Sequence, residues 1–177
     1  MVAMALGLEL LAASIPWDPV DDVVMGGRSA STARVTAEQT VLFTGKVSLE
    51  NNGGFASIKS AEGRFDLGPG AGLCLRVRGD GKRYKLNLAT YGGFDGLRYQ
   101  APFETAAAQW QDVAIPFSAF EPRFRGRLVP DAPPLDPSRV ASFGFVIADR
   151  QAGPFQLEIA RLWTLPAGDE PGRCAPP

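Results

Sequence analysis

The sequence predicts an all-β fold, an antiparallel β-sandwich or jelly roll of the galactose-binding-domain type. First, 20 Gly and 15 Pro make up about one fifth of the 177 residues, a proportion that disfavours a helical bundle. Second, apolar and polar residues alternate in short runs bounded by Gly, Pro, Asn and Asp. Third, no apolar stripe of helical period continues beyond about ten residues. Many short strands in one chain of this length call for two packed sheets.

The elements follow in chain order. Residues 4–13 are apolar but interrupted by Glu9, lack a preceding basic residue and are too short to span a bilayer, so they predict a first strand or short helix and not a signal peptide. We expect a single domain over residues 1–165, followed by a flexible Pro/Gly-rich tail over 166–177. Strands are expected at 41–49, 55–58, 73–78, 84–89, 97–103, 110–117, 140–148 and 155–163.

One pair of these strands can be placed in register. If Asp80-Gly81 forms a two-residue type I′ turn, Val77 faces Tyr84 and the inward pairs are all apolar. The opposite face of this hairpin then carries Arg76, Arg78, Lys85 and, if the next strand joins the sheet, Arg98. This basic face would receive an anionic ligand or an acidic partner. The alternative, slightly favoured, is that carboxylates of the same chain such as Glu158 neutralise it.

Composition excludes several classes of function. The chain has no His, which excludes a Ser-His-Asp or Cys-His catalytic unit and metal sites built on imidazole. A net charge of −1 argues against a nucleic-acid binder. Cys74 and Cys174 could form a disulfide, but a reducing compartment is the simpler interpretation. We expect no cofactor, no metal and no catalytic residue.

The segment 17–29 is the most distinctive, because Asp21-Asp22 precedes an apolar triplet ending at Met25 and then a Gly pair. Adjacent carboxylates do not alternate as the ligands of a calcium loop do, and no second carboxyl can be placed for glycoside cleavage. An enzyme using Asp22 and Asp80 with a divalent cation stays a third-ranked hypothesis. A structured turn is the favoured interpretation.

Three other loops carry candidate binding residues. Asn51 and Asn52 expose two amides that, with Trp110 and Tyr91, could bind a sugar, although a turn is the more common role of such a segment. The Gly-rich loop 91–96 adds Phe94 as a second exposed aromatic residue. The segment 120–127 places Arg123 and Arg125 beside two Phe residues, a combination typical of protein interfaces.

The order of these segments resembles the Complex I intermediate-associated protein 30 family. The matching segments are Trp17 with 21–29, then 43–55, 78–84, 99–103, 115–117, 124–127, 144–151 and 153–159. The resemblance implies a galactose-binding-like jelly roll and, for mitochondrial members, a non-catalytic chaperone role in assembling the NADH:ubiquinone oxidoreductase. With no recognisable presequence, the chain is similar to a prokaryotic stand-alone member. No catalytic residue is transferred with it.

We therefore expect a non-enzymatic, protein-binding assembly factor for a membrane redox complex, either respiratory and complex I-like or photosynthetic. The alternative is a carbohydrate-binding module. The expected partners are protein subunits of that complex, with a sugar or other small ligand as a further option, and neither nucleic acid nor direct membrane insertion is expected. The expected location is the cytoplasm, at the periphery of a membrane complex.

Overall fold

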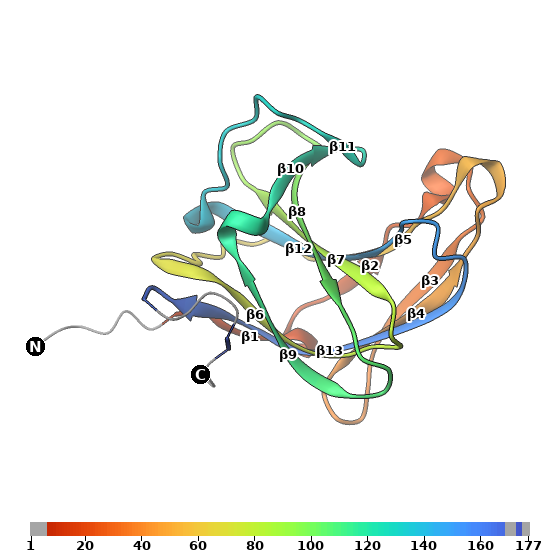
Figure 1. Ribbon diagram of the computed structural model, residues 1–177, viewed down its shortest axis with the longest axis horizontal. Helices are drawn as coiled ribbons and strands as arrows, with labels where there is room; N and C mark the ends of the chain where they lie inside the picture. The colour runs from red at the N-terminus through yellow and green to blue at the C-terminus, as the bar shows by residue number, and fades with distance from the viewer. Residues whose placement is uncertain (1–6, 169–172, 175–177) are drawn as a thin grey trace, which may run out of the picture.

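The computed structural model describes residues 7–168 and 173–174, which form two antiparallel sheets packed face to face (Figure 1). The predicted all-β jelly-roll class is confirmed, since the described residues contain strands and 3₁₀ turns but no α-helix. The six-stranded sheet has the order β3-β4-β13-β6-β9, and β1 also pairs with β13. Its strands are β1 (Glu9–Leu11), β3 (Ala30–Val35), β4 (Val41–Val47), β6 (Gly70–Arg78), β9 (Trp110–Pro116) and β13 (Gly153–Pro166).

The seven-stranded sheet has the order β11-β10-β8-β7-β12-β5-β2. Its strands are β2 (Trp17–Pro19), β5 (Ala56–Ser60), β7 (Arg83–Thr90), β8 (Leu97–Glu104), β10 (Glu121–Phe124), β11 (Arg127–Leu128) and β12 (Val140–Ile147). The 3₁₀ turns of the described chain are η1 (Ala12–Ser14), η2 (Asp22–Met25), η3 (Glu50–Asn52), η4 (Phe117–Ala119) and η5 (Pro137–Arg139).

All eight strands predicted from alternation between residues 41 and 163 are confirmed, with ends shifted by a few residues. The first apolar stretch contains β1 and η1, as expected for a short strand or helix. Strands β2, β3, β10 and β11 were not predicted, because they are short or largely exposed and lack a clear apolar alternation. The tail that we expected to be flexible falls largely on 169–172 and 175–177, which lie outside the described residues.

The predicted hairpin between residues 73 and 88 is wrong. Strand β6 pairs with β9 and β13 in one sheet, whereas β7 pairs with β8 and β12 in the other. Only Gly81 of the Asp80-Gly81 pair has a positive φ, 88°, so the pair does not form the type I′ turn. The Asp80 carboxylate instead accepts hydrogen bonds from the backbone N–H groups of Lys82 and Gln156, which makes this loop a corner between sheets.

The inward face of each strand was nevertheless identified correctly. The side chains of Leu75 and Val77 on β6 and of Tyr84 and Leu86 on β7 are fully buried. They belong to one core cluster and meet between the two sheets instead of along one ladder. A sandwich whose sheets pack through such alternating residues stabilises both layers through one apolar core.

As a result, the predicted basic face is divided between opposite sides of the molecule. Arg76 and Arg78 lie on the six-stranded sheet, and Lys85 and Arg98 lie on the seven-stranded sheet. Arg76 forms an ion pair with Asp112 at 2.9 Å. Arg78 donates two hydrogen bonds to Oε2 of buried Glu158, at 3.1 and 2.6 Å. The alternative that the chain's own carboxylates neutralise these arginines is therefore confirmed.

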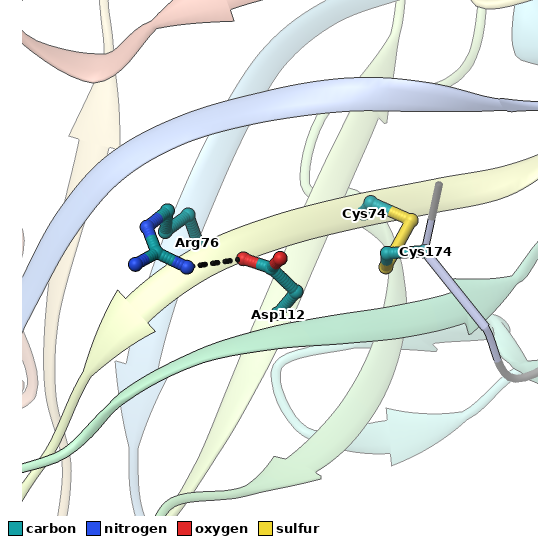
Figure 2. The surroundings of a disulfide bond; sticks show 4 residues. All are labelled: Cys74, Arg76, Asp112 and Cys174. Carbon is teal, nitrogen blue, oxygen red and sulfur yellow. Dashed lines mark hydrogen bonds and ion pairs between the residues drawn. A yellow bond between two sulfur atoms is a disulfide. The ribbon is translucent and has the colours of Figure 1, made fainter. Parts of the chain in front are cut away.

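A disulfide joins Cys74 on β6 to Cys174 near the C-terminus (Figure 2). Cys74 is fully buried and packs with Trp163 and Leu165 of β13 in a small apolar cluster separate from the main core. Residue 174 is thereby held against the outer side of the six-stranded sheet. A reducing compartment, which the sequence favoured, is at odds with this bond, because disulfides persist mainly in oxidising environments.

Removing this disulfide is expected to lower the stability of the domain. The bond joins residues with a sequence separation of 100. For a loop of this length, the reduced chain entropy of the unfolded state stabilises the folded state by about 4 to 5 kcal/mol. We expect Cys174→Ser to lower the free energy of unfolding by about 2–5 kcal/mol in urea titrations. Addition of a reductant should have the same effect on the parent chain and none on the variant. A parent chain insensitive to reductant would contradict the prediction.

Candidate functional site

A groove with a volume of about 1010 Å³ lies over the outer face of the seven-stranded sheet. Its floor is built from the residues of β5, β7, β8 and β12 that point away from the core, because their neighbours along each strand are buried. The floor is mainly polar. Its outward residues are Ser57, Lys59, Lys85, Asn87, Arg98, Gln100, Ser142, Gly144 and Val146.

The centre of the floor carries an amide pair. The side-chain amide of Gln100 donates to the Asn87 side-chain oxygen at 2.8 Å, and these two residues face each other across β8 and β7. Gly144 lies beside Asn87 on the next strand, followed by Lys59. With no side chain at Gly144, the middle of the groove stays open.

Two loop regions form opposite walls. Figure 1 shows η2 and η3 together at one side of the sheet and the β10–β11 hairpin at the other. The η2 wall exposes an apolar tip, since Val23, Val24 and Met25 are 61, 75 and 64% exposed. The hairpin wall contributes Arg123 and Arg125 to the lining. A ligand in the groove would thus meet apolar side chains on one side and guanidinium groups on the other.

The Asp22 carboxylate holds the first wall together. Its Oδ1 accepts a hydrogen bond from the Ser29 N–H at 2.9 Å. Its Oδ2 accepts from the Ser29 hydroxyl at 2.6 Å, the Gly54 N–H at 2.7 Å and the Phe55 N–H at 3.3 Å. Because Asp22 is only 1% exposed, these contacts join η2 to the segment that follows η3 in the interior of the wall. The Asp21-Asp22 and Asn51-Asn52 loops therefore meet.

The neighbouring groups fit tightly around this carboxylate. A Cβ added at Gly27 or at Gly53 would collide with the Asp22 side chain, so both positions need glycine for close approach. Asp21 makes a parallel set of contacts, accepting from the Ser31 N–H and hydroxyl at 2.8 and 2.7 Å and from the Ser57 N–H at 3.1 Å. The favoured interpretation of this motif, a structured turn, agrees with these contacts.

The environment also changes the acidity of Asp22. Burial alone would raise the pKa of its carboxyl group, but the hydrogen bonds from Ser29, Gly54 and Phe55 outweigh burial and hold the pKa below its ordinary value of 3.8. Asp22 is therefore an anion that the backbone N–H groups stabilise, and it has no proton to donate near neutral pH. This arrangement suits a structural anchor better than an acid or base.

Basic side chains outnumber acidic ones in the lining, six to two. They are Lys59, Lys85, Arg98, Arg123, Arg125 and Arg150, against Asp22 and Asp149. Three of the six have carboxylate partners, through the pairs Lys59–Glu62, Lys85–Asp149 and Arg123–Glu121. Among the residues that the structure describes, no carboxylate forms an ion pair with Arg98, Arg125 or Arg150. The groove is thus electropositive in a chain of net charge −1.

The structure brings together seven of the twelve candidate residues named from the sequence. The groove contains Asp22, Met25, Asn52, Lys85, Arg98, Arg123 and Arg125. Asp21, Asn51, Arg76, Tyr91 and Phe94 do not line it. Asn51 is exposed in η3 with φ of 54°. Phe94 is half exposed and its ring lies 6.0 Å from that of Phe124, next to the hairpin wall.

The two aromatic rings proposed as a sugar platform lie elsewhere. Trp110 is on β9 of the other sheet, beneath the guanidinium groups of Arg76 and Arg78 at 5.7 and 5.0 Å. The ring of Tyr91 has Arg64 and Arg139 against it, each 4.9 Å from its centroid. The predicted constellation of Asn51, Asn52, Trp110 and Tyr91 is therefore not one site.

Sequence reasoning missed several groove residues. Lys59, Asn87, Gln100, Ser142 and Arg150 were not singled out as binding residues. For the first four the only signal was that a polar residue alternates with apolar ones on a strand, which does not say which sheet or which outer face it occupies. Arg150 lies in the turn between β12 and β13.

Within residues 7–168 and 173–174 no group of three or more His, Cys, Asp or Glu side chains could hold a metal ion. Asp22 and Asp80, proposed as a cation-binding pair, are engaged separately, since Asp80 bonds to Lys82, Tyr84 and Gln156 at the corner after β6. In the same part of the chain, no helix has the length and apolar character needed to cross a bilayer.

Comparison with known proteins identifies relatives over most of the chain. Residues 11–159 match the family described as Complex I intermediate-associated protein 30. The mitochondrial protein of that name from Drosophila melanogaster is 30% identical over 165 residues, covering 81% of this chain and 56% of that protein. The mouse protein is 30% identical over 176 residues, covering 87% of this chain and 54% of the relative. The chain thus spans about half the length of these relatives.

Solved structures with a similar fold come from carbohydrate-active proteins. The family 11 carbohydrate-binding module of a Clostridium thermocellum cellulase superposes with a TM-score of 0.68 at 15% identity, covering 93% of this chain and 96% of the module. An agarase superposes with a TM-score of 0.57 at 13% identity, covering 93% of this chain and 25% of the enzyme. At such identities the likeness shows the β-sandwich fold alone.

Replacing the anchoring carboxylate should destabilise the domain in a pH-dependent way. In Asp22→Asn the N–H groups of the new amide would face the N–H donors that the carboxylate accepts. We therefore expect the free energy of unfolding at neutral pH to fall by about 2–4 kcal/mol, which lowers Tm by roughly 5–15 °C. Because the folded pKa lies below 3.8, the carboxylate's stabilisation is present above that value and is lost as pH falls through the folded pKa.

The difference in Tm between parent and variant should therefore be constant from about pH 5 to 8 and shrink below pH 4, as measured by thermal denaturation. The matched control is Asp95→Asn at an exposed loop position, which should leave Tm unchanged. Equal effects of the two substitutions would contradict the anchoring role.

Proposed function

Because the chain belongs to the Complex I intermediate-associated protein 30 family, we propose that it is a non-enzymatic module that binds a protein subunit or intermediate of a membrane redox complex during assembly. The observation that carries this proposal is the family match over residues 11–159, which contain nearly the whole sandwich and both walls of the groove. The client is a respiratory complex I-like or a photosynthetic complex.

The groove supports binding in place of catalysis. The chain has no His, and the buried carboxylate in the groove wall, Asp22, accepts four hydrogen bonds, three of them from backbone N–H groups. Exposed apolar residues on one wall and arginines on the other are the combination that protein interfaces favour. These features suit a surface that holds a partner.

We place the module in the cytoplasm, at the surface of the membrane complex. The redox state of Cys74 and Cys174 in cells tests this location, because a disulfide such as theirs persists mainly in oxidising environments.

The client should be recoverable by affinity. A tagged chain incubated with native membranes in mild detergent is expected to retain subunits of a respiratory or photosynthetic complex, identified by mass spectrometry against a tag-only control. Cells lacking the gene should accumulate less of the same complex. Recovery of no such subunit, together with normal complex levels in those cells, would overturn the proposal.

A carbohydrate-binding module is the second candidate, favoured by the amides along the groove, from exposed Asn52 and from partly buried Asn87 and Gln100. The two rings expected to form a sugar platform, Trp110 and Tyr91, lie outside the groove, and the aromatic residues of the groove lining are Phe55 and Phe143. We expect a glycan array to give no binding at millimolar sugar. Binding of an oligosaccharide that is lost in Asn87→Ala but retained in Asn51→Ala, the matched amide outside the groove, would favour this candidate instead.

A further inference from the structure

We infer that the groove binds an extended, acidic segment of the partner protein, through Arg98 and Arg123. This inference rests on the proposed protein-binding function and specifies the chemistry of the partner. Its starting point is the pairing of β8 with β10, which sets Arg98 directly opposite Arg123 across the ladder. Both residues line the groove.

Two like charges directly opposed on a ladder are unfavourable for folding. One of them, Arg123, has Glu121 at 2.7 Å and also donates to the Gly126 carbonyl at 3.0 Å. Arg98 donates to the carbonyl of its own neighbour Leu97 at 2.9 Å; its charge interacts with that of Glu62, but no carboxylate forms an ion pair with it among the described residues. The pair therefore leaves donor capacity facing the groove that a carboxylate could accept.

The remaining charges extend this positive region. Arg125 and Arg150 line the same groove without an ion-pair partner in the described chain, whereas Arg76 and Arg78 on the opposite sheet are both paired with carboxylates. Three arginines that form no ion pair with a described residue thus line a single groove, whereas the exposed Arg34 and Lys46 of the other sheet lie toward opposite ends of the β3–β4 ladder. The grouping of cations in the groove provides charge complementarity for an anionic partner.

The shape of the site favours a polypeptide. A volume of about 1010 Å³ lies at the upper end of the roughly 300–1,000 Å³ typical of small-molecule sites, and gives room for several residues of extended chain. The amides of Asn87 and Gln100 on the floor can bond to a peptide backbone, and Val24 and Met25 offer apolar contacts at the rim. A flat anionic bilayer would touch the walls, including Arg123 on β10, but would not reach Arg98 on the floor strand β8.

The test uses the full chain and defined probes. An array of ten-residue peptides is probed with the purified protein, and the strongest binder is measured by fluorescence anisotropy beside its analogue with Gln in place of Asp and Glu. We expect enrichment of acidic peptides, at least about tenfold weaker binding of the neutral analogue, and affinity that falls with salt.

The variant pair separates binding from folding. Arg98→Gln with Arg123→Gln should weaken the acidic peptide at least about tenfold while leaving Tm unchanged or raising it by roughly 1–3 °C, because a repulsive pair is removed. The matched control is Arg34→Gln with Lys46→Gln, which removes the same charge from exposed positions on β3 and β4 of the other sheet and should not affect binding.

Each contrary outcome has a distinct meaning. The inference would be overturned if no peptide binds, if the enriched peptides lack acidic residues, or if the control variant loses as much affinity as the groove variant. It would also be overturned if the protein binds vesicles of phosphatidylglycerol and phosphatidylcholine more tightly than peptides and needs the same arginines to do so. Recovery of the same complex subunits by parent and groove variant would overturn it while leaving the proposed function standing. Tight acidic-peptide binding without recovery of any redox-complex subunit would overturn the proposed function but not the chemistry of the groove.

Discussion

The candidate site depends on the hydrogen bonds to the Asp22 carboxylate. Residues 22, 29, 54 and 55 come from two loops that neither sheet ladder joins, and backbone N–H groups left unpaired in the interior would cost free energy. A carboxylate has acceptor sites for all of these donors, whereas the single oxygen of an amide or a hydroxyl has only two lone pairs. One side chain thereby fixes the wall that carries Val23, Val24 and Met25. The same contacts explain why a motif that looks acidic and reactive in the sequence is structural.

The sandwich as a whole shows which properties of a β-protein are local. The alternation of buried and exposed residues depends only on the sequence of each strand, so the inward faces of β6 and β7 could be predicted. The partner of a strand is not local, and two strands with complementary apolar faces can pair side by side or pack across a core. The Asp-Gly signal could not decide between them, because the Asp80 side chain bonds to Gln156, 76 residues away.

The residues of the candidate site also differ in whether a local sequence pattern identifies them. Loop residues such as Arg123, Arg125 and Asn52 stood out because their local composition was unusual. Asn87, Gln100 and Lys59 did not, since a polar residue on a half-buried strand has the same pattern whether it faces bulk solvent or a groove. The neutralisation of Arg78 by Glu158 was anticipated, but only the topology shows that it removes the six-stranded sheet from the basic surface.

The placement of the aromatic residues bears on function as strongly as that of the charges. Tyr91 lies against two guanidinium groups and Trp110 beneath two more, so the rings that could stack on a sugar already have cationic partners outside the groove. The groove itself combines amides, lysines and arginines with apolar side chains such as Val24, Met25 and Phe55. The fold resembles carbohydrate-binding modules, yet the amide and cationic groups that line this groove are chemically suited to hydrogen bonding and to negative charge. Recognition of a protein segment therefore requires no change to the sandwich, only a different set of outward side chains on the same strands.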